Sequence, residues 1–147
     1  MSTAMAIGSA LVLGLAFTAQ STAANPVSSQ TGPVLTHEQV LHIALTEAGN
    51  SQDPHPKRIE MATGTLSVAM RVIESGASTS PAGDEAVDLV VMRGFFHINA
   101  SHPRGRSIPP GKVMCLILNT HTGFVEARSL GNKVPFLSHL GRVTQLR

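Results

Sequence analysis

The stretch VMCLILNTHTGFVEARSL, residues 113–130, decides the fold that this chain is predicted to adopt. Val113–Leu118 is apolar at every position, which is typical of a strand buried on both faces of a sheet. Asn119–Gly123 is polar and ends in a glycine suited to a positive φ, so it predicts a turn. Phe124–Leu130 then returns as the partner strand. The stretch therefore predicts a β-hairpin whose first strand is central in its sheet.

Two segments upstream extend the sheet that is predicted around this hairpin. Ala86–Ile98 places apolar side chains on one face and Arg93 and His97 on the other, the alternation typical of a half-buried strand. Lys57–Thr63 is expected to be a short strand or an extended lead-in. Downstream of the hairpin, Pro135–Leu140 is expected to form a short helical turn. The sheet is therefore predicted to have three to four strands and to be mainly antiparallel.

Two helices are predicted before these main strands. The first runs from residue 37 to about residue 48, because Thr36 and Gln39 have the spacing of a capping box and apolar residues follow at helical intervals. The second covers Thr65–Glu74, which also has apolar residues at helical spacing, with a strand as the alternative because several residues are β-branched. The predicted fold class is α+β, with one or two helices covering one face of the sheet.

The apolar residues of these elements define the expected hydrophobic core. It consists of Val40, Leu41, Leu45, Leu66, Met70, Val90, Met92, Phe96, Met114, Leu116 and Leu118. Cys115 lies in the same central strand and is the sole cysteine, so it cannot form an intramolecular disulfide. We expect a buried thiol there, with a reactive nucleophile or an intermolecular disulfide as the alternatives.

The stretch THEQVLH, residues 36–42, resembles the zinc-protease pattern His-Glu-x-x-His at first sight. Its second histidine comes five residues after the first, so His37 and His42 point about 140° apart on a helix and do not share one ion. The chain has seven histidines, and their spacing matches no metal motif. We therefore expect no metal site, no cofactor and no catalytic constellation, although scattered side chains could still converge in space.

The N-terminal residues differ from the rest of the chain. Residues 1–24 combine a short apolar run with small residues before Asn25, the pattern of a signal peptide cleaved after Ala24, although the segment has no Lys or Arg. Residues 25–34 are expected to be a flexible leader and residues 35–147 a single α+β domain. The expected location is therefore secreted or extracytoplasmic. An uncleaved N-terminal membrane anchor is the alternative.

Charge is distributed unevenly along the chain. Between Glu38 and Asp88 there are eight acidic and three basic residues, a net charge of −5, whereas from Leu89 onward eight basic residues face Glu126 alone, a net charge of +7. Four residues of the loop after the Ala86–Ile98 strand are candidates for contact with an anionic surface: His102, Arg104, Arg106 and Lys112. A solvated basic face is the alternative. Nucleic acid is not an expected partner, because aromatic residues are few and no nucleic-acid-binding module is visible.

A resemblance to known proteins rests on three stretches. DLVVMRGFF (residues 88–96), PPGKVMCLILNTHTGFVEARSLG (residues 109–131) and LGRVTQL (residues 140–146) together resemble small uncharacterised secreted proteins of high-GC Gram-positive bacteria. The hairpin is also weakly similar to the last hairpin of PepSY-type domains, in which a helix packs on a small antiparallel sheet. The resemblance implies an extracytoplasmic helper or inhibitor-like module and supplies no catalytic residues.

The expected function is a secreted, non-enzymatic binding module of unknown ligand. Its partner is expected to be an anionic cell-envelope polymer or a secreted protein. One alternative is a small hydrolase or metal-dependent enzyme whose site forms only in space. Another is a protease inhibitor-like module.

Overall fold

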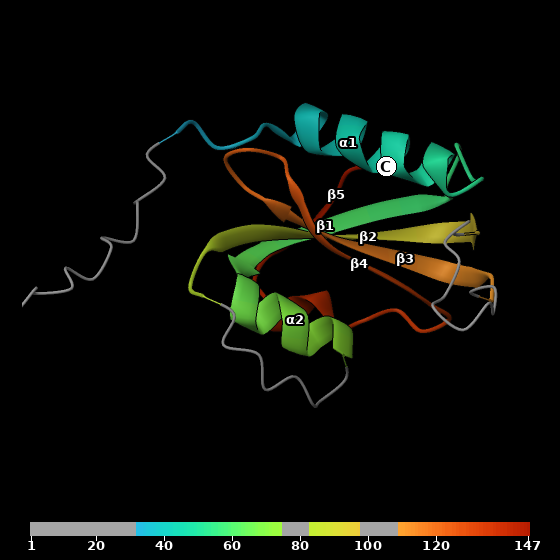
Figure 1. Ribbon diagram of the computed structural model, residues 1–147. Coiled ribbons are helices and arrows are strands. Elements are labelled where there is room, and N and C mark those ends of the chain that lie inside the picture. Colours follow the sequence, from blue (N-terminus) through green and yellow to red (C-terminus); the bar gives the residue numbers. More distant parts are fainter. Residues whose placement is uncertain (1–31, 75–82, 98–108) are drawn as a thin grey trace, which may run out of the picture.

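The computed structural model describes residues 32–74, 83–97 and 109–147 (Figure 1). Within these ranges the chain forms two α-helices, a 3₁₀ helix and a five-stranded sheet. The elements in chain order are α1 (His37–Asn50), β1 (Arg58–Thr65), α2 (Leu66–Glu74), β2 (Ala86–Phe96), β3 (Gly111–Asn119), β4 (Val125–Gly131), the 3₁₀ helix η1 (Leu137–His139) and β5 (Val143–Gln145). The predicted α+β class is confirmed.

The strands of the sheet lie in the order β4-β3-β2-β1-β5, and every pair is antiparallel. β3 has β2 and β4 as its neighbours, so the hairpin and its place near the centre of the sheet are confirmed. The sheet has one strand more than predicted, because β5 pairs with Glu60–Ala62 of β1. β5 was missed because a strand of three residues is too short to show alternation in sequence.

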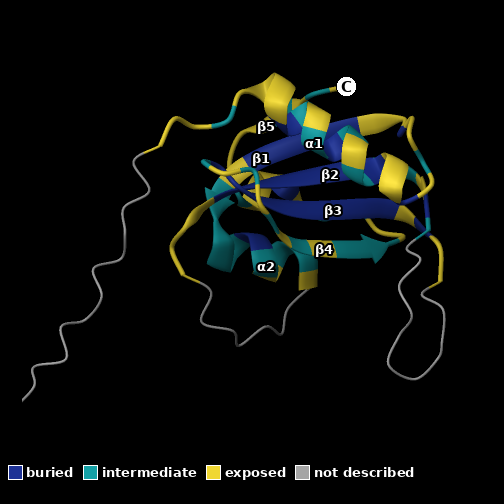
Figure 2. Cartoon of the chain, turned by 45° about the horizontal axis from the view of Figure 1, so that its top comes forward, coloured by how far each residue is buried: buried dark blue, intermediate teal, exposed yellow. Residues whose placement is uncertain are grey.

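The two helices lie on opposite faces of the sheet (Figures 1 and 2), so the prediction that they cover one face was wrong. α1 packs against a cluster that includes Ile59, Val90 and Leu116. α2 and η1 pack against the alternate residues of the same strands, such as Leu89 and Ile117. The sheet needs cover on both faces, because an apolar face left in water forfeits about 25 cal/mol for each Å² that it could bury.

The prediction of a single covered face was wrong because β2 is buried on both faces. Arg93 and His97 suggest a polar face, but Arg93 lies near the C-terminal end of β2 and His97 just beyond it, while every residue from Val87 to Met92 is buried. Figure 2 shows β1, β2 and β3 as the buried interior of a sandwich of helix, sheet and helix. β2 is therefore a central strand with two apolar faces, not a half-buried one.

The predicted core residues are therefore divided between two clusters. Seven of them are fully buried in the cluster between α1 and the sheet: Val40, Val90, Met92, Phe96, Met114, Leu116 and Leu118. The half-buried Leu41 and Leu45 border this cluster, whereas Leu66 and Met70 of α2 belong to the cluster on the other face.

Local signals explain where α1 begins and how the hairpin turns. The Gln39 backbone N–H donates to Thr36 Oγ1 at 3.3 Å, and the Thr36 N–H donates to Gln39 Oε1 at 2.8 Å, so the predicted capping box is present. In the hairpin, Asn119 Oδ1 accepts from the backbone N–H groups of His121 and Thr122, both at 3.1 Å. Gly123 has φ +70°, as its glycine identity predicted.

Candidate ligand-binding pocket

The predicted anionic-contact residues fall mostly outside the described part of the chain. His102, Arg104 and Arg106 belong to residues 98–108, which the structure does not describe. Lys112 is described: it is exposed near the start of β3, and its backbone N–H donates to Asn132 Oδ1 at 3.3 Å. The structure therefore ties Lys112 to the segment after β4 and leaves the contact hypothesis as a prediction.

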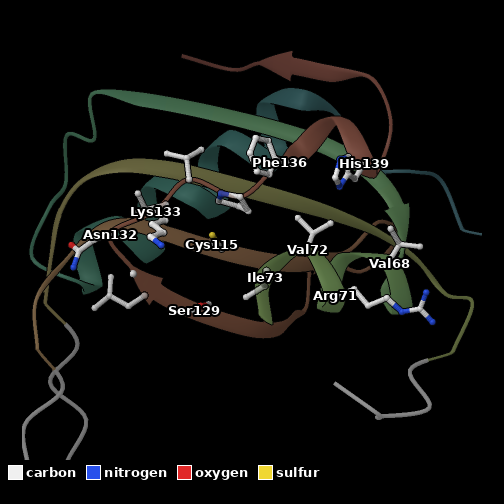
Figure 3. A pocket seen from close by; sticks show the side chains of 15 residues that line it. Val68, Arg71, Val72, Ile73, Cys115, Ser129, Asn132, Lys133, Phe136 and His139 are labelled. Atoms are coloured by element: carbon white, nitrogen blue, oxygen red, sulfur yellow. The ribbon is translucent and has the colours of Figure 1, made fainter. Parts of the chain in front are cut away.

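A pocket of about 830 Å³ opens on the face of the sheet that α2 covers (Figure 3). One wall is α2, the floor is formed by β3 and β4, and the other wall is the chain from Asn132 to His139. This volume lies within the range of about 300–1,000 Å³ that small-molecule sites occupy. The pocket is therefore large enough for a metabolite-sized ligand.

Small side chains on the edge strand create this hollow. The register pairs Ile117 with Ala127 and Cys115 with Ser129, and Gly131 lies opposite Val113. Consequently β4 places only Ala, Ser and Gly on the face toward α2. Larger residues there would fill the space between α2 and the segment after β4. Val72 and Ile73 of α2 therefore face a hollow lined by the small residues of β4.

The charged side chains that line the pocket are all basic. Arg71 of α2 and Lys133 contribute positive charge to its wall, and His139 and Asn132 add polar side chains. None of the described lining residues is Asp or Glu. Charges at the edge of an apolar cavity act through a lower effective dielectric constant than charges in bulk water. The pocket therefore favours an anion at its rim.

Phe136 gives this rim an aromatic surface. Its side chain is 75% exposed, the largest exposure among the big hydrophobic residues in the described ranges. Its ring stacks on the His139 imidazole, with centroids 5.8 Å apart and planes at 27°. A largely exposed phenyl ring can shield the apolar part of a ligand from water with the ring face that remains open. Phe136 therefore extends the apolar lining beyond the floor.

Cys115 lies on the pocket floor but is only 5% exposed. Burial raises the pKa of its thiol to about 12, because the thiolate would lose its hydration there. At neutral pH the sulfur therefore stays protonated and acts as an apolar surface, whereas a nucleophile requires the thiolate. The expected buried thiol is confirmed, and Cys115 is free.

The histidines do not gather into a metal site within the part of the chain that the structure describes. No group of three or more His, Cys, Asp or Glu side chains is placed there to hold an ion. The described imidazoles have separate neighbours: His97 packs edge-on against Phe95, His121 Nδ1 lies 2.8 Å from the Gly32 carbonyl, and His139 stacks on Phe136. Across the described ranges, no helix is both long and apolar enough to span a membrane.

Sequence reasoning missed this pocket, although two signals point to it. The first is the run of small residues at alternate positions of β4, namely Ala127, Ser129 and Gly131. The second is the absence of any acidic residue after Glu126, although four Lys or Arg residues follow it. Neither signal predicts that α2 crosses the same face of the sheet, which is a tertiary property.

The fold and the pocket define a class of protein: an α+β domain with an antiparallel sheet between two helices and an apolar pocket with a basic rim on one face. Comparison of the chain with protein-family models, with curated proteins and with solved structures finds no match. The functional argument therefore rests on the geometry of the pocket.

Proposed function

We propose that this protein is a non-enzymatic binding module for a small molecule that has an apolar body and one anionic group. The observation that carries the proposal is the lining of the α2-side pocket. Its floor and α2 wall are largely apolar, its charged residues are Arg71 and Lys133, and its described lining includes no acid. The apolar body would lie over Cys115 and Ser129, with the anion at the basic rim.

The lining also favours binding over catalysis. Nucleophilic catalysis needs an activated nucleophile with a base beside it. Burial raises the pKa of the Cys115 thiol to about 12, which removes the thiolate at neutral pH. General acid–base catalysis at this site would have to rely on His139, which stacks on Phe136 and has no carboxylate beside it among the lining residues.

The size of the pocket sets the expected affinity. Ligands of about 15–20 non-hydrogen atoms bind with roughly −0.3 kcal/mol per atom or better, or about −5 to −6 kcal/mol in total. That free energy corresponds to a dissociation constant of about tens to hundreds of micromolar. The interaction is therefore measurable by calorimetry or by NMR at ordinary protein concentrations.

The proposal includes the place where binding occurs. Residues 1–24 support export by their signal-peptide pattern, and the ligand would then be met in the cell envelope or outside it. Intact-mass measurement of the exported protein should show a chain that begins at Asn25 or within a few residues of it. Recovery of the protein only in membranes, with residues 1–24 attached, would instead indicate an N-terminal anchor.

Binding is tested with three probes that share a twelve-carbon chain. Dodecanoate and cationic dodecyltrimethylammonium are titrated below their micelle concentrations and neutral dodecanol below its solubility limit, and backbone amide shifts are followed. Dodecanoate is expected to bind most tightly and the cation most weakly. Replacing Ser129 by leucine should abolish binding, because the side chain would occupy the hollow without displacing packed atoms.

Rim variants test the charge part of the proposal. Exposed charge contacts contribute about 0.2–1 kcal/mol each. The double variant Arg71→Gln with Lys133→Gln should therefore lower the affinity for dodecanoate by about tenfold and leave the affinity for dodecanol unchanged. Arg142→Gln is the matched control, since Arg142 is exposed and does not line the pocket. Equal affinity for all three probes, or an equal loss in the control, would contradict the proposal.

A further inference from the structure

A second group of charges lies on β1 and β2, on the same face of the sheet as the pocket but not among the residues that line it, although Arg93 pairs with the lining residue Val113. Arg58 Nη2 lies 2.8 Å from Glu60 Oε1, and Arg93 Nη2 lies 3.3 Å from Glu60 Oε2. The strand register places Arg58 directly opposite Arg93, so both side chains leave the same face of the sheet. Like charges in directly opposite positions destabilise a sheet pair. The Glu60 carboxylate neutralises only one of the two guanidinium groups, so the group of Arg58, Glu60 and Arg93 keeps a net charge of +1.

Within the described part of the chain, most donors of these two guanidinium groups have no acceptor. Each guanidinium has five N–H donors, and each gives one hydrogen bond to Glu60. The Arg93 Nε atom is buried and finds no acceptor among the described residues. A buried donor without an acceptor is rare in folded proteins and requires an explanation, such as a bound ion. Residues 98–108, which follow β2 in the sequence, contain no Asp or Glu.

Glu60 holds both guanidinium groups in place without covering them. Its side chain is only 11% exposed, whereas the side chains of Arg58 and Arg93 are 45% and 43% exposed. The carboxylate therefore orients the two groups from below while their outer edges face solvent. Planar guanidinium groups held in this way match the oxygen atoms of a phosphate group, which they bind through paired hydrogen bonds.

We propose that Arg58 and Arg93 form an oxyanion site that binds a phosphate group. The site goes beyond the proposed function, because neither residue lines the α2-side pocket. The phosphate can belong to a free anion or to a repeating unit of a phosphate-containing polymer. Glu60 has the role of a positioning residue, and its negative charge weakens the site that it organises.

The test follows the arginine Nε–H signals of the full chain by ¹H–¹⁵N NMR. Inorganic phosphate is added at constant ionic strength, with sodium chloride as the balancing salt. The Arg93 Nε–H signal is expected to shift and to saturate. In a parallel titration, linear polyphosphate should saturate the same signal. If polyphosphate binds more than tenfold more tightly than inorganic phosphate, calculated per phosphate group, the site is assigned to a polymer. If the two bind equally per phosphate group, the site is assigned to single phosphate groups.

Single variants are expected to keep the fold, because Glu60 retains one partner in each. Arg58→Gln and Arg93→Gln should each weaken phosphate binding by about tenfold, the loss expected for a charge-assisted hydrogen bond. Arg128→Gln is the matched control: Arg128 is 47% exposed and pairs with Glu47 at 3.0 Å on the α1 side of the sheet. This variant should bind phosphate as the parent does.

The Glu60→Gln variant distinguishes two roles for this group of residues, an anion-binding site and a purely structural ion pair. The variant keeps both guanidinium groups and raises the local charge from +1 to +2, so phosphate should bind several-fold more tightly. A purely structural triad predicts lower stability and no gain in binding. Absence of saturation in both titrations, or an equal loss in Arg128→Gln, would overturn the proposal. Dodecanoate affinity should stay unchanged in all these variants, so failure of this site and failure of the pocket are distinguishable.

Discussion

Replacing Asp88 with asparagine is expected to stabilise this protein at neutral pH. Asp88 is 2% exposed and lies on the α1 side of β2, where the Thr63 hydroxyl donates to its Oδ1 at 2.6 Å. Loss of hydration raises the pKa of this carboxyl above 3.8, although the Thr63 hydrogen bond and the charge of His37 act in the opposite direction. Asparagine keeps an acceptor for Thr63 and removes the buried charge.

The sign of the pH dependence follows from the raised pKa. Because the folded protein holds the Asp88 proton more tightly than the unfolded chain does, ionisation costs folding free energy as the pH rises above 3.8. Below that pH the carboxyl is neutral in both states and the cost disappears. We expect Asp88→Asn to be more stable than the parent at pH 7 by about 1 kcal/mol, the usual size of a single-substitution effect. That gain corresponds to about 3–6 °C in melting temperature.

Urea denaturation of both proteins between pH 4 and pH 8 measures this effect. The difference in free energy of unfolding should grow as the pH rises and level off above the folded-state pKa of Asp88. Asp84→Asn is the matched control, because Asp84 is exposed and its substitution should change stability by less than about 0.5 kcal/mol. A less stable Asp88→Asn protein at pH 7, or a gain that does not vary with pH, would refute the reasoning.

Three further predictions concern single residues. Cys115 should react slowly with a thiol reagent at pH 8 in the folded protein and at least tenfold faster in urea, because its pKa is raised to about 12 by burial; equal rates would contradict its placement. Gly94→Ala should cost about 2–3 kcal/mol in a denaturation experiment, because a Cβ there would overlap Asp53 Oδ2, which accepts the Phe95 N–H at 2.6 Å. An unchanged free energy of unfolding in Gly94→Ala would contradict the close approach of Asp53 Oδ2 to Gly94. Thr36→Ala should cost about 1 kcal/mol through loss of the α1 cap, and Thr36→Ser should restore most of it.

The sequence predicted the elements whose signals are local. The Thr36–Gln39 capping box marks the start of α1, and the apolar run of β3 with its turn at Asn119–Gly123 identifies the hairpin. These signals lie within a few residues of the structure that they specify. The second helix was predicted one residue early, at Thr65, where β1 ends and α2 begins.

The sequence did not predict relations between distant segments. Placing α1 and α2 on opposite faces requires knowing that Val87 to Met92 is buried on both sides, which two polar residues at the strand end concealed. The pocket depends on the distance between α2 and β4, and the Arg58–Glu60–Arg93 group depends on the register of β1 against β2. Such relations arise from tertiary packing, which overrides local propensity.

The position of β5 has a consequence for the order in which the molecule folds. β5 closes the outer edge of β1 by pairing Gln145 with Glu60, residues that are 85 positions apart in the chain. Until the ribosome has made residues 143–145, β1 keeps an unpaired edge, and contacts of such long sequence separation form late. A chain that completes its sheet so late stays incompletely folded for longer after synthesis. Its exposed β1 edge is then the segment on which a chaperone, or another unfolded copy, would first act.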